Sequence, residues 1–99
     1  MVQINWTNRA KKDLKQIHDF ISNDSFTYAN NQVNRILYRV EVLIHLPLVG
    51  KTVQEINDKT IREIIEGNYR IIYRIMSPNR IDILTIHHGA RSFKKRKIK

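Results

Sequence analysis

Cysteine is absent from this chain of 99 residues. Its absence excludes disulfide bonds, thiolate metal sites and cysteine nucleophiles, and it is compatible with the reducing cytoplasm, which is the compartment we expect. Long apolar runs are absent too, and no stretch approaches the roughly 20 residues that a membrane-spanning helix needs. The opening residues, MVQINWTNRA, lack the charged segment and apolar stretch of a secretory signal. We therefore expect no contact with a membrane.

Acidic residues are scarce: nine stand against 18 lysines and arginines, which gives a formal net charge of +9. Residues 91–99 contain six basic residues and no acidic one. Such a concentration of charge is typical of proteins that meet nucleic acid, the ribosome or an acidic protein. A solvated, partly disordered end is an equally good interpretation. The length suits one domain, which we place at residues 1–90, followed by a basic tail at residues 91–99.

Sequence signatures of catalysis are missing as well. There is no glycine-rich phosphate loop, HExxH motif, serine elbow or obvious pair of catalytic carboxylates. His18 and His45 have no partner at metal-ligand spacing, so we expect no metal and no cofactor. His87 and His88 are adjacent near the end of a predicted strand, so their side chains point to opposite faces. Either can titrate near neutral pH and exchange a proton, although packing or hydrogen bonding is the more common role at such a position.

The first half of the chain carries patterns of regular structure. Apolar residues alternate with polar ones over residues 2–6, which predicts a strand buried on one face. Apolar stripes at helical spacing predict one helix from about residue 8 to 22 and a second from about residue 26 to 46. Pro47 ends the second helix. The short turn between the two helices predicts a helical hairpin.

The second half predicts strands. Residues 48–60 show no periodicity, so we expect an irregular connection in which Gly50 is able to take a positive φ. Residues 61–66, 69–76 and 80–87 follow as three strands joined by two tight turns. The order of one strand, two helices and three strands predicts an α+β fold, in which the helical hairpin covers one face of an antiparallel sheet.

Alternation divides the middle strand, residues 69–76, into two faces. The face expected beneath the helices carries Tyr69, Ile71, Tyr73 and Ile75. The other face, expected to be open, carries Arg70 and Arg74. On the preceding strand both sets of alternating residues contain aliphatic side chains, so either Arg62 or Glu63 lies beside Arg70. A basic, partly apolar surface can grip phosphates or a partner peptide, but arginines paired with nearby acids are the commoner arrangement.

Three segments, in this order, resemble the RelE/ParE superfamily of toxins from bacterial type II toxin–antitoxin modules. They are the opening INWTNRAKKDLKQIHDFI, the connection LPLVGKTV with its P-x-x-G pattern, and the block IREIIEGNYRIIYRI followed by IDILTIHHGAR. The resemblance covers nearly the whole chain up to Arg91. It implies a cognate acidic antitoxin whose C-terminal segment wraps the toxin, so that the two form a tight hetero-oligomer.

The resemblance also implies one of two targets. RelE-type members cut mRNA in the ribosomal A site without a metal ion, using arginines, lysines and a terminal tyrosine or histidine. ParE-type members bind DNA gyrase and block it without chemistry of their own. Arg70 and Arg91 match basic positions of the nucleases, with His87 or His88 as the group that would exchange a proton. The last aromatic residue is Phe93, which cannot exchange one, so we interpret the chain as closer to the ParE type.

We therefore predict a toxin that inhibits growth by binding DNA gyrase, with a ribosome-dependent mRNA endoribonuclease as the alternative. A small nucleic-acid-binding module is a third possibility that rests on charge alone. Under the nuclease alternative the catalytic residues are Arg70, Arg91, His87 and His88. The predicted target or partner surface consists of basic residues from the strands and the tail: Arg62, Arg70, Arg74, Arg91, Lys94, Lys95 and Arg96.

Overall fold

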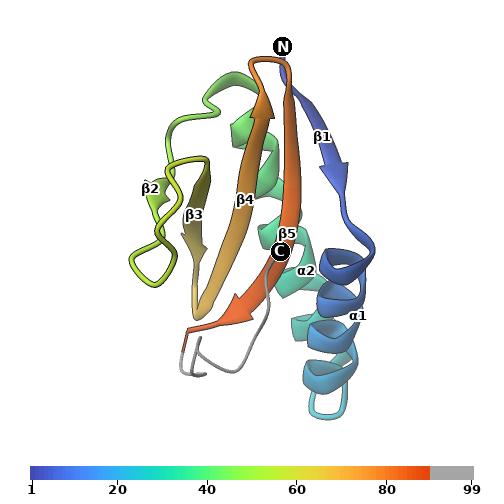
Figure 1. Ribbon diagram of the computed structural model, residues 1–99. Coiled ribbons are helices and arrows are strands. Elements are labelled where there is room, and N and C mark those ends of the chain that lie inside the picture. The colour runs from blue at the N-terminus through green and yellow to red at the C-terminus, as the bar shows by residue number, and fades with distance from the viewer. Residues whose placement is uncertain (90–99) are drawn as a thin grey trace.

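The computed structural model describes residues 1–89, in which a helical hairpin packs against a five-stranded sheet (Figure 1). Each predicted element is present to within one residue of its expected bounds. In chain order the elements are β1 (Gln3–Trp6), α1 (Asn8–Ser22), α2 (Phe26–His45), β2 (Lys51–Thr52), β3 (Ile61–Glu66), β4 (Tyr69–Ser77) and β5 (Arg80–His88). The predicted α+β class is therefore confirmed.

Both helices begin at a capping side chain. The hydroxyl of Thr7 accepts a hydrogen bond from the N–H of Ala10 at 3.2 Å and donates one to the carbonyl of Ile83 at 2.7 Å, so this residue starts α1 and ties it to β5. Ser25 starts α2 by accepting from the N–H of Tyr28 at 3.1 Å. Neither of these two helices, the only ones among residues 1–89, has the length and apolar character needed to cross a membrane.

The sheet is mixed, with strand order β1-β5-β4-β3-β2. β1 pairs in parallel with β5, whereas the other neighbouring strands pair antiparallel. The three C-terminal strands pair antiparallel, as predicted. The parallel pairing of β1 with β5 was not predicted, because alternation over residues 2–6 identifies a strand without saying which neighbour it joins. β2 was not predicted, since its two residues are too few to show any periodicity.

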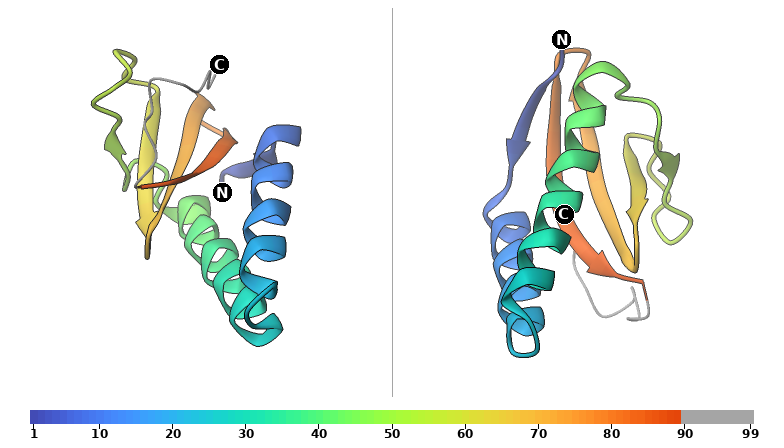
Figure 2. Two further views of the ribbon diagram at one scale, coloured as in Figure 1. Left: turned by 90° about the horizontal axis from the view of Figure 1, so that it is seen from below. Right: turned by 180° about the vertical axis from the view of Figure 1, so that it is seen from behind.

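The two faces of the sheet are covered differently. The helical hairpin covers one face (Figure 2) and encloses the main core, which includes the predicted residues Tyr69, Ile71, Tyr73 and Ile75. The opposite face was expected to be open, but the connection between β2 and β3 packs on part of it. There Val53 joins Ile61 and Ile72 in a second, smaller buried cluster. This cluster holds residues 53–60 against the face that carries Arg70 and Arg74.

Gly50 is required for space and not for an unusual backbone conformation. Tyr73 is fully buried, and its hydroxyl donates to the carbonyl of Pro47 at 2.9 Å while accepting from the N–H of Gly50 at 3.0 Å. A Cβ atom at Gly50 would lie 2.5 Å from that hydroxyl. Gly50 does not use the positive φ that a glycine is able to take: within residues 1–89 the glycine with positive φ is Gly67, at 58°, in the turn between β3 and β4.

Candidate functional site

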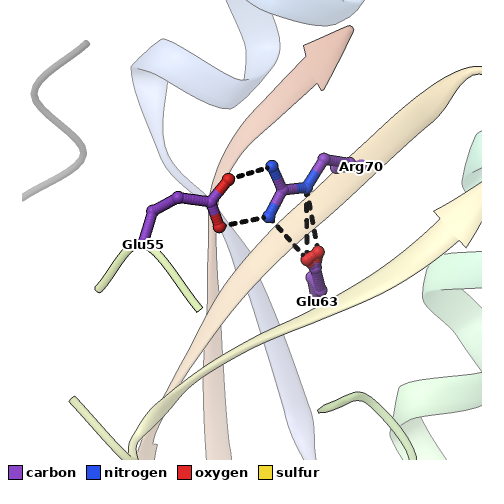
Figure 3. A network of polar contacts seen from close by, with 3 residues as sticks. All are labelled: Glu55, Glu63 and Arg70. Carbon is purple, nitrogen blue, oxygen red and sulfur yellow. Dashed lines mark hydrogen bonds and ion pairs between the residues drawn. The ribbon is translucent and has the colours of Figure 1, made fainter. Parts of the chain in front are cut away.

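Arg70 is the centre of a network of three charged side chains on the sheet face opposite the helices (Figure 3). Its Nη1 and Nη2 atoms donate to Glu55 at 2.8 and 3.0 Å. Its Nε and Nη2 atoms donate to Glu63 at 2.9 and 2.8 Å. Forked contacts between arginine and carboxylate are among the strongest hydrogen bonds in proteins. Glu63, and not Arg62, is therefore the residue of β3 that lies beside Arg70.

The network lies partly inside the protein. The side chains of Glu63, Arg70 and Glu55 are 4%, 16% and 40% exposed, respectively. The hydrogen bonds from Arg70 lower the pKa of Glu55 from its ordinary 4.5 to about 2. The bonds to Glu55 and Glu63 in turn raise the pKa of Arg70 above its already high ordinary value. All three guanidinium nitrogen atoms of Arg70 thus donate to two carboxyl groups of the same chain.

The two adjacent histidines lie on opposite faces of the sheet, as alternation predicted. His87 is the cross-strand partner of Arg70 and is fully buried, so it shares the face of the charged network. His88 pairs with Tyr69 on the helix side, and the two rings meet edge to face with their centroids 5.3 Å apart. The fold therefore brings Arg70 and His87 together and separates His88 from both.

The other predicted surface arginines also have partners within the chain. Arg74 lies on the same face as Arg70, where its Nη2 atom is 3.0 Å from the carboxylate of Asp58. Hydrogen bonds from Thr60, with a smaller contribution from Arg74, lower the pKa of Asp58 from 3.8 to about 2. Arg62 lies on the helix side, where its Nη1 atom donates to the carbonyl of Gly50 at 2.7 Å. The predicted surface is therefore divided between the two faces of the sheet.

Four of the predicted residues lie outside the described part of the chain. They are Arg91, Lys94, Lys95 and Arg96, and their roles stay predictions. No group of three or more histidine, aspartate or glutamate side chains within residues 1–89 is arranged to hold a metal ion.

Sequence reasoning missed two of the three carboxylates that pair with the arginines of β4. Glu55 and Asp58 fall in the connection where no periodicity exists, so alternation could not place them. One signal was present: they are the only acidic residues between positions 42 and 62, and they precede a strand with two arginines at similar spacing. A charge-pairing argument from that pattern would have suggested that the connection folds back onto β4.

Comparison with known protein families gives one match. The family model described as the ParE toxin of the type II toxin–antitoxin system parDE matches residues 4–93. No curated protein sequence matches the chain.

The same fold occurs in solved structures of low sequence identity. A chain of the chromosomal ParDE system from P. aeruginosa is 20% identical with a TM-score of 0.68, and the match covers 89% of this chain and 96% of that one. A chain of the RelBE2 toxin–antitoxin complex from Mycobacterium tuberculosis is 22% identical with a TM-score of 0.63, covering 88% and 96%. A chain of the DinJ–YafQ complex from E. coli is 17% identical with a TM-score of 0.68, covering 94% and 99%. At these identities the likeness concerns the fold.

Replacement of Arg70 should destabilise the protein strongly. Arg70→Ala leaves Glu63, which is 4% exposed, without its cation, and loss of one partner from a buried ion pair costs about 3 kcal/mol. Lys15→Ala is the control, because Lys15 and Asp19 are 78% and 59% exposed in their ion pair and an exposed pair contributes less than ~1 kcal/mol. Urea unfolding at neutral pH measures both, and equal losses for the two variants would contradict a stabilising role for the network.

The contribution of Glu55 to stability should vanish in acid. Its pKa is about 2 in the folded protein and 4.5 ordinarily, so the contribution is fully present above pH 4.5 and is lost as the pH falls toward 2. We expect Glu55→Gln to lower the free energy of unfolding in urea at pH 7 by at most ~1 kcal/mol, because this side chain is 40% exposed. The difference from the unmodified protein should shrink across that pH window.

The matched control for this pH series is Glu41→Gln. Glu41 is exposed on α2 and forms no ion pair with another residue of the described range. Its difference from the unmodified protein should stay small from pH 7 to pH 2. If the free energy of unfolding of Glu55→Gln differs from that of the unmodified protein by the same amount at pH 7 and pH 2, the ion pair with Arg70 does not stabilise the folded state.

Proposed function

The chain belongs to the ParE family of toxins from type II toxin–antitoxin systems, and from this premise we propose that it inhibits growth by binding DNA gyrase in the cytoplasm. A cognate acidic antitoxin neutralises it in a hetero-oligomeric complex. The alternative target is the ribosome, on which the chain would cut mRNA. The two targets make different demands on the charged face of the sheet, because cleavage needs chemical groups and inhibition by binding needs only a complementary surface.

The pairing of Arg70 is the observation that carries this proposal. Cleavage of RNA without a metal ion requires a cation that faces the developing negative charge of the phosphorane. Arg70 matches the nuclease position, yet its guanidinium donates to Glu55 and Glu63 within the chain. A phosphate bound to Arg70 would lie close to the carboxyl groups of Glu55 and Glu63, and like charges at such short range repel. This arrangement favours a stabilising role for Arg70 over a catalytic one.

The positions of the histidines support the same conclusion. RNA cleavage also needs a base for the 2′-OH proton and an acid for the leaving 5′-oxygen. His87 shares a face with Arg70 but is fully buried, and His88 lies on the other face against Tyr69. The two histidines therefore do not flank one phosphate beside Arg70. Binding without chemistry requires neither group.

The charge of the chain supports an acidic antitoxin. A formal net charge of +9 disfavours close approach of basic molecules and speeds association with acidic ones. The three related structures are toxin–antitoxin systems or complexes, which fits a toxin that is held by a partner protein.

Two assays run in parallel on the purified chain test the proposal. The first measures supercoiling of relaxed plasmid by DNA gyrase, and the second measures mRNA cleavage on translating ribosomes. We expect loss of supercoiling with intact mRNA, and recovery of supercoiling when the toxin is first mixed with its antitoxin. Codon-spaced cuts in mRNA with normal supercoiling would overturn the proposal and assign the phosphate contacts to Arg70 and Arg91.

A further inference from the structure

Three aliphatic side chains project from the connection between α2 and β2. Leu46, Leu48 and Val49 are 57%, 64% and 54% exposed, and all fall within four consecutive residues. Single exposed aliphatic residues are common on protein surfaces, but several gathered in one loop indicate a site of interaction. We call residues 46–49 the apolar loop. It leaves α2 at the end of the molecule where the N-terminus lies (Figure 1).

The backbone of the apolar loop is held from beneath. The hydroxyl of Tyr73 donates to the carbonyl of Pro47 at 2.9 Å and accepts from the N–H of Gly50 at 3.0 Å. Arg62 donates to the carbonyl of Gly50 at 2.7 Å. Within the loop, the N–H of Val49 donates to the carbonyl of Leu46 at 3.1 Å. The backbone is therefore fixed at both ends of the loop by side chains that belong to the sheet.

The ring of Tyr73 lies on the inner side of the segment that carries the aliphatic side chains. The space beneath the loop is filled by the ring of Tyr73, which is fully buried and lies so close to Gly50 that a Cβ there would sit 2.8 Å from the ring atom Cε1. The buried ring therefore occupies the inner side of the chain at Gly50, directly after Leu48 and Val49, whose side chains are exposed. The P-x-x-G segment of the sequence is thus a rigid support for exposed apolar side chains, which otherwise favour burial.

We propose that the apolar loop is the surface with which this toxin contacts its target, inserting Leu46, Leu48 and Val49 into an apolar pocket of a protein rimmed by acidic side chains. Identification of that protein as DNA gyrase rests on the function proposed above. The apolar side chains supply the burial, and the exposed Lys51 that follows the loop supplies the charge that meets an acidic rim. The backbone contacts reduce the conformational entropy lost on binding.

The charge of the chain and the small area of the apolar loop favour a target protein over two other partners, a second copy of the chain and the antitoxin. A second copy of the chain would carry the same formal charge of +9, and this repulsion opposes self-association. An antitoxin that keeps its toxin inactive needs a tight and extensive interface, whereas three side chains fit the smaller contacts, below ~1,200 Å², of transient complexes. A reversible encounter with a target is of this smaller kind.

Substitution of Leu48 tests the proposal directly. Leu48→Ser should weaken binding of the purified chain to gyrase by about tenfold or more, measured by calorimetry, because it removes the most exposed anchor. The same variant should relieve growth arrest on induced expression and keep its affinity for the antitoxin. The matched control is Ile65→Ser, which removes an aliphatic side chain that is 45% exposed on β3, away from the apolar loop, and should change none of the three measurements.

A second variant tests the rigidity of the apolar loop without touching its side chains. Tyr73→Phe keeps the aromatic ring in the core but removes the hydroxyl that binds Pro47 and Gly50. We expect a folded protein, verified by circular dichroism, with target binding weakened by about tenfold and antitoxin binding unchanged. Target affinity equal to that of the unmodified chain would show that the support does not matter for binding.

The outcomes separate this proposal from the proposed function. If Leu48→Ser keeps both gyrase affinity and growth arrest, the apolar loop is not the contact surface. If the variant loses antitoxin affinity as strongly as target affinity, the loop binds the antitoxin, which also overturns the proposal. If the unmodified chain has no affinity for gyrase, the proposed target is wrong. Growth arrest then decides between the remaining outcomes. If Leu48→Ser no longer arrests growth while Ile65→Ser still does, the apolar loop is the contact with another target. If Leu48→Ser still arrests growth, the proposal for the apolar loop is overturned.

Discussion

The ion pair between Arg70 and Glu63 organises the face of the sheet that lies opposite the helices. It joins the neighbouring antiparallel strands β3 and β4, and Glu55 extends it to the connection that follows β2. Because Glu63 is 4% exposed, its carboxylate requires the guanidinium beside it. The second buried cluster, around Val53, forms where the same connection is drawn onto the sheet. The charged network and the apolar cluster therefore hold one segment by two kinds of contact.

The consequence for function follows from that arrangement. A guanidinium that stabilises the fold through two carboxyl groups is poorly suited to stabilise a transition state, since catalysis requires an interaction that strengthens as the reaction proceeds. On the helix side of the sheet, Tyr73 and Arg62 support a loop whose aliphatic side chains remain exposed. One face of the sheet thus carries arginines that are paired within the chain, and the exposed apolar loop is the contact surface that we propose. Both features suit a toxin that acts by binding.

Much of the fold could be predicted from the sequence, because strands and helices leave a periodic signal. The alternation of Tyr69, Ile71 and Tyr73 identified the core face of β4, and the stripes of both helices gave their bounds. The pairing of strands leaves no periodic signal in the sequence. Residues 2–6 alone do not reveal that β1 joins β5 in parallel. The orientation of β3 was also undetermined, since both of its faces contain isoleucine.

The candidate site was harder to predict than the fold, because its parts come from segments that the sequence does not relate to one another. Arg70 was identified as important from its context and Glu63 was one of two candidates for its neighbour, but its partner Glu55 depends on how an aperiodic connection returns to the sheet. The presence of Gly50 was plain from the sequence, whereas its purpose is set by the hydroxyl of Tyr73, 23 residues away. Contacts of this kind become visible only when the chain is folded.

The most direct measurement concerns a variant in which the buried pair is replaced by apolar residues, Arg70→Met with Glu63→Leu. Such replacements often keep or increase stability when the volumes are similar. Urea unfolding would confirm that the double variant is folded, and growth arrest on induced expression would then be compared with that of the unmodified chain. If Arg70 acts only by stabilising the fold, the folded variant still arrests growth. A folded variant that no longer arrests growth would show that Arg70 takes part in the toxic activity itself, which would contradict a purely stabilising role for this residue.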